Sequence, residues 1–536
     1  MPSSAVTTSP RTGPVPGRSQ RPGITLAIML CAQLMIVLDL TVVNIALPSI
    51  AHGLHFSVSS LSWVLNAYAL TFGGLLLLGG RAGDILGRRR VFLAGLALFT
   101  VASLAGGLAT SAAWLLAARA AQGVGGAIAA PAVLAIIVSG YPDGRERTRA
   151  LSLFTAVMMG GGSLGLVLGG LITQWASWRW VLFINVPIGL AVLLIGPRFI
   201  AESARQPGRL DLAGALTSTV GVAALVYGFI KASTSGWSDL LTLAAFGAAV
   251  VLLASFIMIE TRSPQPITPL RLFADRSRSA SFVVRLLLVA GMFGMFFFLT
   301  QFVQKVLGLT PLEAGLSFLP MTGALFGVSR LAPTLLPRFG AKPLMVAGLI
   351  PAVAGMAWLG QLSPGSTYLS GVLGPMLLLG AGLGIAFVPL TMTSLAGVAP
   401  EESGAAASMV NVTQQVGGAL GLAILVTVFG SASRSAARHP LAHAGPVAQL
   451  HHVLTHAMAV AFTVAAGFDL IALLIVVLVI RMRPAHPAGP DPRPPTMTEH
   501  INSASVVAED APDARVQLLR PAAHRSGQHA VPPPDQ

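Results

Sequence analysis

The chain has 536 residues, of which 54% are hydrophobic and only 10% are charged, and its mean hydropathy is +0.76. Water-soluble domains carry far more charge, so this composition excludes a soluble globular protein and indicates a polytopic membrane protein. The net charge of +14 comes from short basic clusters between apolar runs, which is typical of membrane loops and excludes a nucleic-acid-binding face. The single cysteine, Cys31, excludes an intrachain disulfide.

About fourteen apolar runs have the length that a bilayer-spanning helix needs, so the sequence predicts an all-α membrane protein. Residues 1–22 before them are rich in Ser, Pro and Arg, and residues 484–536 after them lack a periodic apolar pattern, so both are predicted to be disordered tails. The predicted spans are 24–46, 61–80, 91–110, 114–139, 148–173, 180–200, 210–230, 239–260, 282–304, 311–336, 343–361, 368–393, 404–430 and 457–481.

Arginines gather on alternate loops, for example at 88–90 and 145–149, and the positive-inside rule places such loops in the cytoplasm. An even number of spans then leaves both termini cytoplasmic.

Two similar segments, 87–96 and 340–349, each lead from a cytoplasmic loop into the next span. This repeat predicts two pseudo-symmetric six-helix bundles with a central site between them near the middle of the membrane. The predicted domains are 23–200 for the first bundle, 201–262 for two linker helices and 263–483 for the second bundle.

Asp39 lies inside the first predicted span, where a charged side chain costs about 2.5–3.5 kcal/mol on insertion scales. From the helical rise, Asp39 is about 22 Å from the inner end of its span and Arg119 about 7–8 Å from the outer end of the fourth. In a hydrocarbon core of about 30 Å these depths coincide, so an Asp39–Arg119 ion pair is predicted. A nearby cation favours the charged carboxylate and burial favours the neutral one, so a conformational change would bind or release a proton. The alternative is that Arg119 snorkels to the interface.

The segment 80–90, GRAGDILGRRR, joins the second and third spans. Its glycines permit a tight turn, and Asp84 beside three arginines predicts a charge network that holds one closed state of the cytoplasmic side. The alternative is a basic loop that only sets the topology. The segment resembles the signature loop of the major facilitator superfamily, although Ile85 stands where that family usually has a base. The matching positions are Gly80, Asp84, Gly87, Arg89 and Arg90.

The fifth span contains glycines at four-residue spacing in GGSLGLVLGG, residues 161–170. Such spacing lets two helices touch backbone to backbone, and physical reasoning alone predicts a packing seam. The segment is similar to the antiporter motif of the superfamily, GxxxGPxxGG, which implies export. Leu166 replaces the proline of that motif and removes a kink, so proton-coupled import by symport on the same fold remains the alternative. The matching positions are Gly161, Gly165, Gly169 and Gly170.

Segments 38–48, 178–189 and 404–418, together with the number of spans, resemble the bacterial drug:proton antiporter branch of the superfamily. The resemblance implies a monomeric, lipid-embedded plasma-membrane protein that exports lipophilic, often cationic drugs or antibiotics and uses the proton gradient. Arg119 and its neighbours resemble the arginine motif that the family associates with proton transfer. The predicted substrate-cavity residues are Asn44, Gln122, Asn185 and Asp469.

Asp469 is a second acid within a span and is predicted to bind a cationic substrate or a second proton, with structural pairing as the alternative. Arg285, near the start of its span, is predicted to snorkel to the interface. No HExxH, paired-aspartate, GxSxG or P-loop motif occurs in the spans, so neither an enzyme, an ATPase nor a cofactor is predicted. Five histidines of one outside loop are predicted to be solvated rather than to bind metal. They are His439, His443, His451, His452 and His456.

Overall fold

A computed structural model describes residues 22–141, 145–202, 205, 211–263, 270–398, 403–440 and 445–481. The predicted tails lie outside these ranges, except for Pro22. Within them every regular element is a helix, which confirms the predicted all-α fold. The elements are α1 (Pro22–Leu54), α2 (Val58–Leu61), α3 (Trp63–Leu86), α4 (Arg88–Gly107), α5 (Ala112–Gly140), α6 (Arg145–Trp175), α7 (Trp180–Phe183), α8 (Asn185–Phe199), α9 (Leu212–Ser235), α10 (Leu240–Arg262), η1 (Leu270–Phe273), α11 (Arg276–Lys305), α12 (Pro311–Ser317), α13 (Leu319–Ser329), α14 (Ala332–Phe339), α15 (Ala341–Leu359), η2 (Tyr368–Leu373), α16 (Gly374–Leu395), α17 (Ser403–Arg438) and α18 (Pro446–Leu478).

Thirteen helical segments of the described residues are long and apolar enough to cross a membrane. The 31 residues of α6 form a further helix, about 46 Å long at 1.5 Å per residue, and this helix covers the predicted span 148–173. The chain is therefore a multi-pass membrane protein. The predicted ends differ most at the last span, because Pro446 at the first turn of α18 starts that helix eleven residues before the predicted start at 457.

Local signals in the sequence explain where several helices begin. Asp211, Asp239 and Asp275 cap α9, α10 and α11, since each carboxylate accepts a hydrogen bond from a backbone N–H of the first turn. Thr310 and Glu313 form a reciprocal capping box at the start of α12. Polar residues in the loops thus satisfy donors that the apolar helices cannot satisfy themselves.

The two repeated segments have the same local geometry. Gly87 precedes α4 with φ +105°, and Gly340 precedes α15 with φ +79°, a conformation that favours glycine. Eight residues later, Gly95 packs against the backbone of α5 and Gly348 against the backbone of α16. The predicted internal repeat is therefore visible in the packing, whereas the exact domain boundaries remain predictions.

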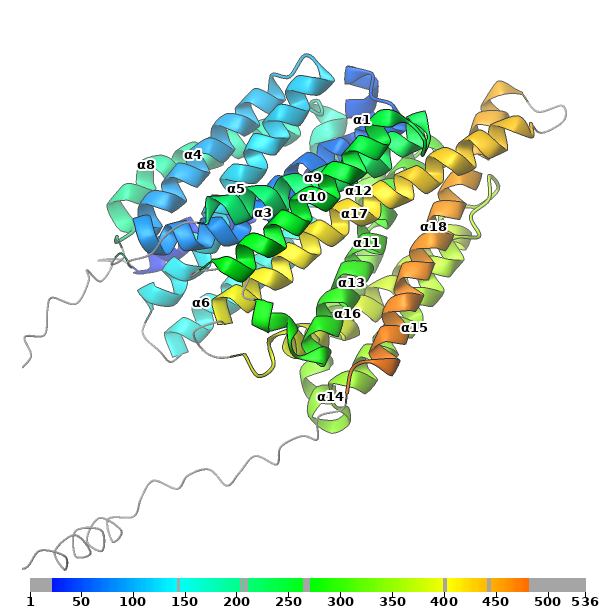
Figure 1. The fold of residues 1–536 in the computed structure, drawn as a ribbon. Coiled ribbons are helices and arrows are strands. Elements are labelled where there is room, and N and C mark those ends of the chain that lie inside the picture. The colour runs from blue at the N-terminus through cyan, green and yellow to red at the C-terminus, as the bar shows by residue number, and fades with distance from the viewer. Residues whose placement is uncertain are drawn as a thin grey trace, which may run out of the picture. The chain divides into compact units, whose positions relative to one another are not determined.

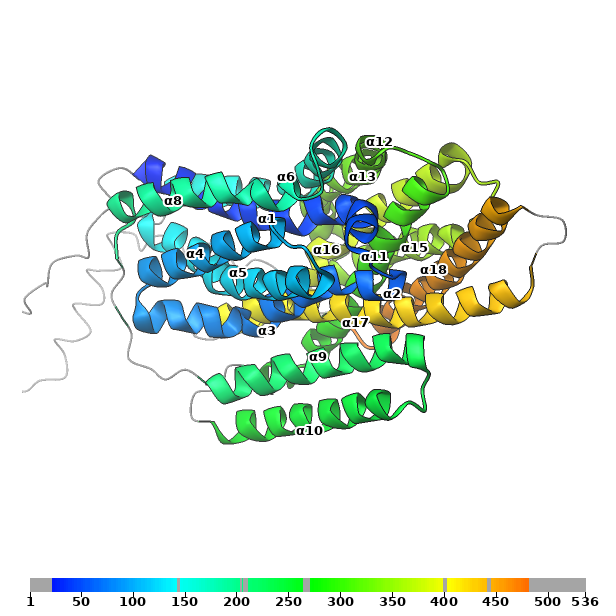
Figure 2. The same cartoon turned by 90° about the horizontal axis from the view of Figure 1, so that it is seen from above.

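The first bundle contains α1 and α3 to α8, and the second contains α11 to α18 (Figure 1). The linker helices α9 and α10 lie to one side, with α9 along α3 and α17, and α10 outside α9 (Figure 2). Thr427 Oγ1 of α17 donates to the carbonyl of Phe229 in α9 over 2.6 Å. Thr219 of α9 is so close to Gly74 of α3 that a side chain there would overlap it. Helix α9 therefore contacts both bundles.

We call the end of the helices at which α3 meets α4 the arginine end, and the opposite end the far end. The bundles meet toward the far end, where Gln304 Nε2 donates to the Ile45 carbonyl over 3.0 Å and the Leu312 N–H donates to Gln174 Oε1 over 3.1 Å. A large apolar cluster there joins residues of both bundles, among them Val42 and Phe298. These contacts join the two bundles toward the far end.

Candidate functional site

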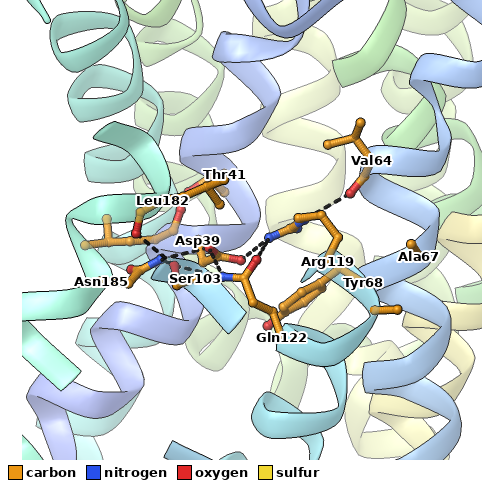
Figure 3. A network of polar contacts seen from close by, with 12 residues as sticks. Asp39, Thr41, Val64, Ala67, Tyr68, Ser103, Arg119, Gln122, Leu182 and Asn185 are labelled. Atoms are coloured by element: carbon orange, nitrogen blue, oxygen red, sulfur yellow. Dashed lines mark hydrogen bonds and ion pairs between the residues drawn. The ribbon is translucent and has the colours of Figure 1, made fainter. Parts of the chain in front are cut away.

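Asp39 lies at the centre of a buried polar network (Figure 3). Arg119 Nη1 donates to Asp39 Oδ2 over 2.5 Å, and the two side chains are 0 and 1% exposed. Gln122 Nε2 and Asn185 Nδ2 both donate to Asp39 Oδ1, over 3.0 and 2.9 Å. The same two amide groups also contact Ser103 Oγ over 3.0 Å each. One carboxylate thus receives three hydrogen bonds from side chains of α5 and α8.

Arg119 is held by contacts with α3 as well as by Asp39. Its Nε donates to the Val64 carbonyl over 3.0 Å, and its Cζ lies 4.5 Å from the centroid of the Tyr68 ring. The guanidinium Nη2 is buried without a hydrogen-bond partner, as is the Tyr68 hydroxyl. The ion pair therefore joins α1 to α3 through α5, and a change in the charge of Asp39 acts on three helices.

The depth argument from the sequence accounts for the pair but not for its surroundings. Gln122 lies one turn after Arg119 on α5, so both side chains point the same way, and Gln122 Oε1 accepts from Arg119 Nη1 over 3.1 Å. Ser103 and Tyr68, which the sequence analysis did not single out, complete the network. Both residues are 0% exposed. The only signal that the sequence offers for them is a polar side chain within an apolar run.

The three consecutive arginines of the segment at the arginine end all form ion pairs, but only one of them pairs with Asp84. Asp84 near the end of α3 pairs with Arg88 at the start of α4 over 2.9 Å, and no ion pair of Asp84 with Arg89 or Arg90 is found among the described residues. The latter two approach Glu202, whose carboxylate lies 3.7 Å from the Nε atom of each. Glu202 follows α8 and was not identified in the sequence, because no spacing relates it to this segment.

Glu202 also explains the glycine of the turn. Its Oε1 accepts from the Arg89 backbone N–H over 3.1 Å, and a Cβ at Gly87 would lie 2.7 Å from the same oxygen. Gly80 makes an ordinary packing contact with Pro131 of α5. All these partners belong to the first bundle, so the contacts described here do not join the two bundles. The predicted role in closing the cytoplasmic side remains a prediction for another conformation.

The glycine series of α6 is a packing seam against α1. A Cβ at Gly161 would lie 2.9 Å from Val37 Cγ1, one at Gly165 would overlap the Thr41 hydroxyl, and one at Gly169 would lie 2.7 Å from the Val42 carbonyl oxygen. Gly170 instead faces the backbone of Pro311 at the start of α12. The seam thus holds α6 against the helix that carries Asp39, and its last glycine reaches the second bundle.

Leu166, the residue that departs from the proline of the antiporter motif, lies in the contact between the bundles. It is 4% exposed, and its carbonyl oxygen is so close to Gly315 of α12 that a side chain there would overlap it. Small residues on both α6 and α12 therefore allow their backbones to meet near the far end.

Comparison with known proteins identifies the family. The model of the family described as Major Facilitator Superfamily matches residues 29–422. The chain belongs to the Major Facilitator Superfamily. It is similar to the puromycin resistance protein pur8 of Streptomyces alboniger, with 44% identity over 442 residues that cover 81% of this chain and 88% of the relative. It is also similar to the cephamycin export protein CmcT of Amycolatopsis lactamdurans, with 41% identity and coverage of 78 and 88%.

The solved structures that resemble this Major Facilitator Superfamily chain share its fold. One is a bacterial homologue of the human lysosomal transporter Spinster in an inward-facing and unoccupied conformation, with 16% identity and a TM-score of 0.58. The match covers 88% of this chain and 100% of that one. The predicted superfamily, its drug-efflux branch and the class of transporter rather than enzyme are confirmed.

Two of the predicted cavity residues do not join the Asp39 network. Asn44 Oδ1 is buried without a hydrogen-bond partner on α1, one turn beyond Thr41. Asp469 of α18 is 2% exposed, and its Oδ1 likewise has no partner. A Cβ at Gly291 of α11 would lie 3.3 Å from that oxygen, so Asp469 lies inside the second bundle. Gln122 and Asn185 bind Asp39 directly, and the transport roles of all four remain predictions.

The prediction that Arg285 snorkels to the interface is wrong. Its side chain is 4% exposed and turns into the second bundle, where Nη2 donates to Thr391 Oγ1 over 2.5 Å and Cζ lies 5.5 Å from the Phe387 ring centroid. A charged hydrogen bond contributes about 1.5–3 kcal/mol, and a cation–π contact about 0.5–2 kcal/mol. Burying an ion costs several kcal/mol even after relaxation, and none of the ion pairs found among the described residues gives Arg285 a counter-ion.

The histidines of the predicted outside loop are partly helical. His451, His452 and His456 lie within α18, because that helix extends well before the predicted span, and the rings of His452 and His456 stack at 6.2 Å. His443 lies outside the described residues. Among the residues that the structure describes, no group of three or more His, Cys, Asp or Glu side chains could hold a metal ion.

Gly169→Ala should destabilise the protein, whereas the matched change Gly162→Ala should not. Both substitutions raise the helix propensity by the same amount. A Cβ at Gly169 would lie 2.7 Å from the Val42 carbonyl oxygen, whereas a Cβ at Gly162 would have no atom within 4 Å. Overpacking of this kind costs about 1–3 kcal/mol, which thermal unfolding in detergent would detect. Equal melting temperatures for the two variants would contradict the seam.

Proposed function

We propose that this transporter exports a lipophilic antibiotic or drug in exchange for protons, with Asp39 as the group that carries the proton. The observation that carries the proposal is the buried carboxylate of Asp39, held by one cation and two neutral amides. The names of the similar resistance and export proteins support an exported small molecule. No ATP-binding motif occurs in the sequence, so the proton gradient is the proposed source of energy, without a cofactor.

Proton binding acts on the helices through Arg119. When Asp39 is charged, Arg119 is held between Asp39 and the Val64 carbonyl, so α1 and α3 are linked. Protonation of Asp39 removes the charge that attracts the guanidinium and weakens this link. Six residues further along α1, the Ile45 carbonyl accepts the hydrogen bond of Gln304 from the second bundle. The proton thus shifts the equilibrium toward opening of the far end, where the bundles now meet.

The proposed location is the bacterial plasma membrane, with the arginine end and both termini in the cytoplasm, as the positive-inside rule requires. The far end then faces outward, and the contact between the bundles closes the path on that side. A protein in this conformation takes up its substrate from the cytoplasm or from the inner leaflet. We further propose that a single chain, surrounded by lipid, performs the cycle with one or more protons as its coupled partner.

Export can be tested with everted membrane vesicles and radiolabelled puromycin, the antibiotic named for one relative. The lumen of such vesicles corresponds to the outside of the cell, so an acidic lumen should drive puromycin inward. Vesicles without the protein, and vesicles treated with a protonophore, are the controls.

Accumulation that the protonophore abolishes supports proton antiport. If puromycin is not accumulated, a panel of lipophilic cations and antibiotics replaces it in the same assay. Proton-driven movement of the solute out of the vesicles instead would identify the symport alternative, and accumulation that survives the protonophore would refute proton coupling.

A further inference from the structure

The second bundle contains a buried arginine without an acidic partner. Arg285 of α11 is 4% exposed, and its Nε has no hydrogen-bond partner, while Nη2 bonds only to the neutral hydroxyl of Thr391. The ion pairs found among the described residues join other arginines to Asp39, Asp84 and Glu202. A buried arginine is usually paired with a carboxylate, as Arg119 in the first bundle is with Asp39. Arg285 lacks one.

The side chain of Arg285 points toward the inside of the protein. Arg285, Met292 and Phe296 recur at intervals of seven and four residues, so they share one face of α11. Phe296 contacts Phe318, where α12 joins α13, with ring centroids 5.3 Å apart. Val283, two residues from Arg285 and thus on the other side of the helix, is 46% exposed. The arginine therefore faces the neighbouring helices and not the lipid.

The buried acid of this bundle, Asp469, does not neutralise Arg285. Asp469 approaches α11 at Gly291, six residues beyond Arg285. Six residues correspond to about 9 Å along the helix and roughly 120° around it, so the two side chains lie on different faces. Arg285 and Asp469 therefore do not form an ion pair with each other.

We propose that Arg285 binds a carboxylate group of the exported molecule. The inference rests on the proposed function and adds to its lipophilic substrates a class of molecules with an anionic group beside an apolar one. The edge of a guanidinium matches the two oxygens of a carboxylate, and Nε and Nη2 of Arg285 offer such an edge, with Nε free and Nη2 bonded only to a hydroxyl. Phe387 at 5.5 Å supplies an aromatic surface beside this charge.

The position along α11 fits a site on the inward part of the path. Arg285 is nine residues, or about 13–14 Å, from the start of α11 at the arginine end. The bundles are joined at the other end, by Gln304 of the same helix. An acidic substrate that enters from the arginine end therefore reaches Arg285 before it reaches the depth of Asp39.

The test measures thermal unfolding of the full-length protein in phosphatidylcholine nanodiscs, with benzoate or the neutral analogue benzamide at equal ionic strength. We expect benzoate to raise the melting temperature of the wild type and benzamide not to. Arg285→Gln should lose the benzoate effect, whereas Arg285→Lys should retain part of it. The matched control is Lys305→Gln, which removes another base of α11 and should keep the full benzoate effect.

The melting temperature of Arg285→Gln without ligand adds a second measure. Because the charge lacks a counter-ion, its removal should leave the protein as stable as the wild type or more stable. A large loss of stability would indicate a structural role instead. Equal effects of benzoate on the wild type and on Arg285→Gln, or equal effects of benzoate and benzamide, would overturn the proposal.

A lipid phosphate could supply the same anionic chemistry. Nanodiscs with phosphatidylglycerol separate the two sources, because a lipid ligand would stabilise the wild type over Arg285→Gln without benzoate and would remove the benzoate effect. That result would assign Arg285 to lipid and overturn the substrate proposal. Since none of these measurements uses transport, their failure would leave the puromycin test of proton-driven export unaffected.

Discussion

Replacing Asp39 by asparagine should abolish proton-driven accumulation of substrate in everted vesicles. Asparagine keeps the shape of the side chain and can still accept from Gln122 and Asn185, but it cannot bind and release a proton. Transport down a substrate gradient should remain, because the path between the bundles is unchanged. The measurement is the ratio of internal to external substrate with and without an imposed pH gradient.

The single substitution leaves Arg119 as a buried cation without a counter-ion, so its effect on folding must be separated from its effect on coupling. The double variant Asp39→Asn, Arg119→Gln removes both charges and keeps polar groups of similar size. We expect it to melt near the wild-type temperature and still to lack proton-driven accumulation. Wild-type accumulation by the double variant would exclude Asp39 from proton coupling.

Arg119→Ala should have the largest effect on stability of any single change in the first bundle. It leaves the Asp39 carboxylate buried, removes the contact with the Val64 carbonyl, and empties the space over the Tyr68 ring. Removing one partner of a buried ion pair costs about 3–5 kcal/mol. Thermal unfolding in nanodiscs would show this as a marked decrease in melting temperature and in yield.

A double-mutant cycle tests the cause of that loss. If the uncompensated carboxylate is responsible, adding Asp39→Asn to Arg119→Ala should restore much of the lost stability. Arg119→Lys is the matched control, since it keeps the charge but cannot bond Asp39 and Val64 at once. Additive losses in the double variant would show that packing of Arg119, and not the ion pair, is the main contribution.

The architecture was predictable because membrane helices are long and apolar. The number of spans, the repeat at Gly87 and Gly340, and the two linker helices all follow from hydropathy and local similarity. The ends of α17 and α18 were not predictable in this way, because both helices extend beyond the apolar runs that hydropathy detects.

The Asp39–Arg119 pair could be predicted from depth alone, since two buried opposite charges at one level favour each other. Depth does not say which neighbours share their space. Gln122 and Asn185 were therefore assigned to a substrate cavity, although both donate to Asp39. Ser103 joins the same network from α4, and only the packing of that helix reveals it.

The error at Arg285 and the failure to find Glu202 have the same physical origin. Sequence distance from a helix end suggested that Arg285 could reach the interface, but the direction of a side chain depends on which neighbours surround the helix. Glu202 and the arginines at 89 and 90 are far apart in sequence and meet only after the first bundle has packed. No spacing rule can find such a contact.

Infrared difference spectroscopy of the protein in nanodiscs tests the central claim most directly. Acidification of the wild type should produce the carbonyl band of a protonated buried carboxyl, and addition of an exported substrate should shift the pH at which the band appears. Asp469 is a second buried carboxyl, so the band of Asp39 is taken from the difference between the wild type and the double variant Asp39→Asn, Arg119→Gln, which should lack the contribution of Asp39. A spectrum in which this band is equally present in both proteins, or in which Asp39 keeps one protonation state with and without substrate, would contradict the account.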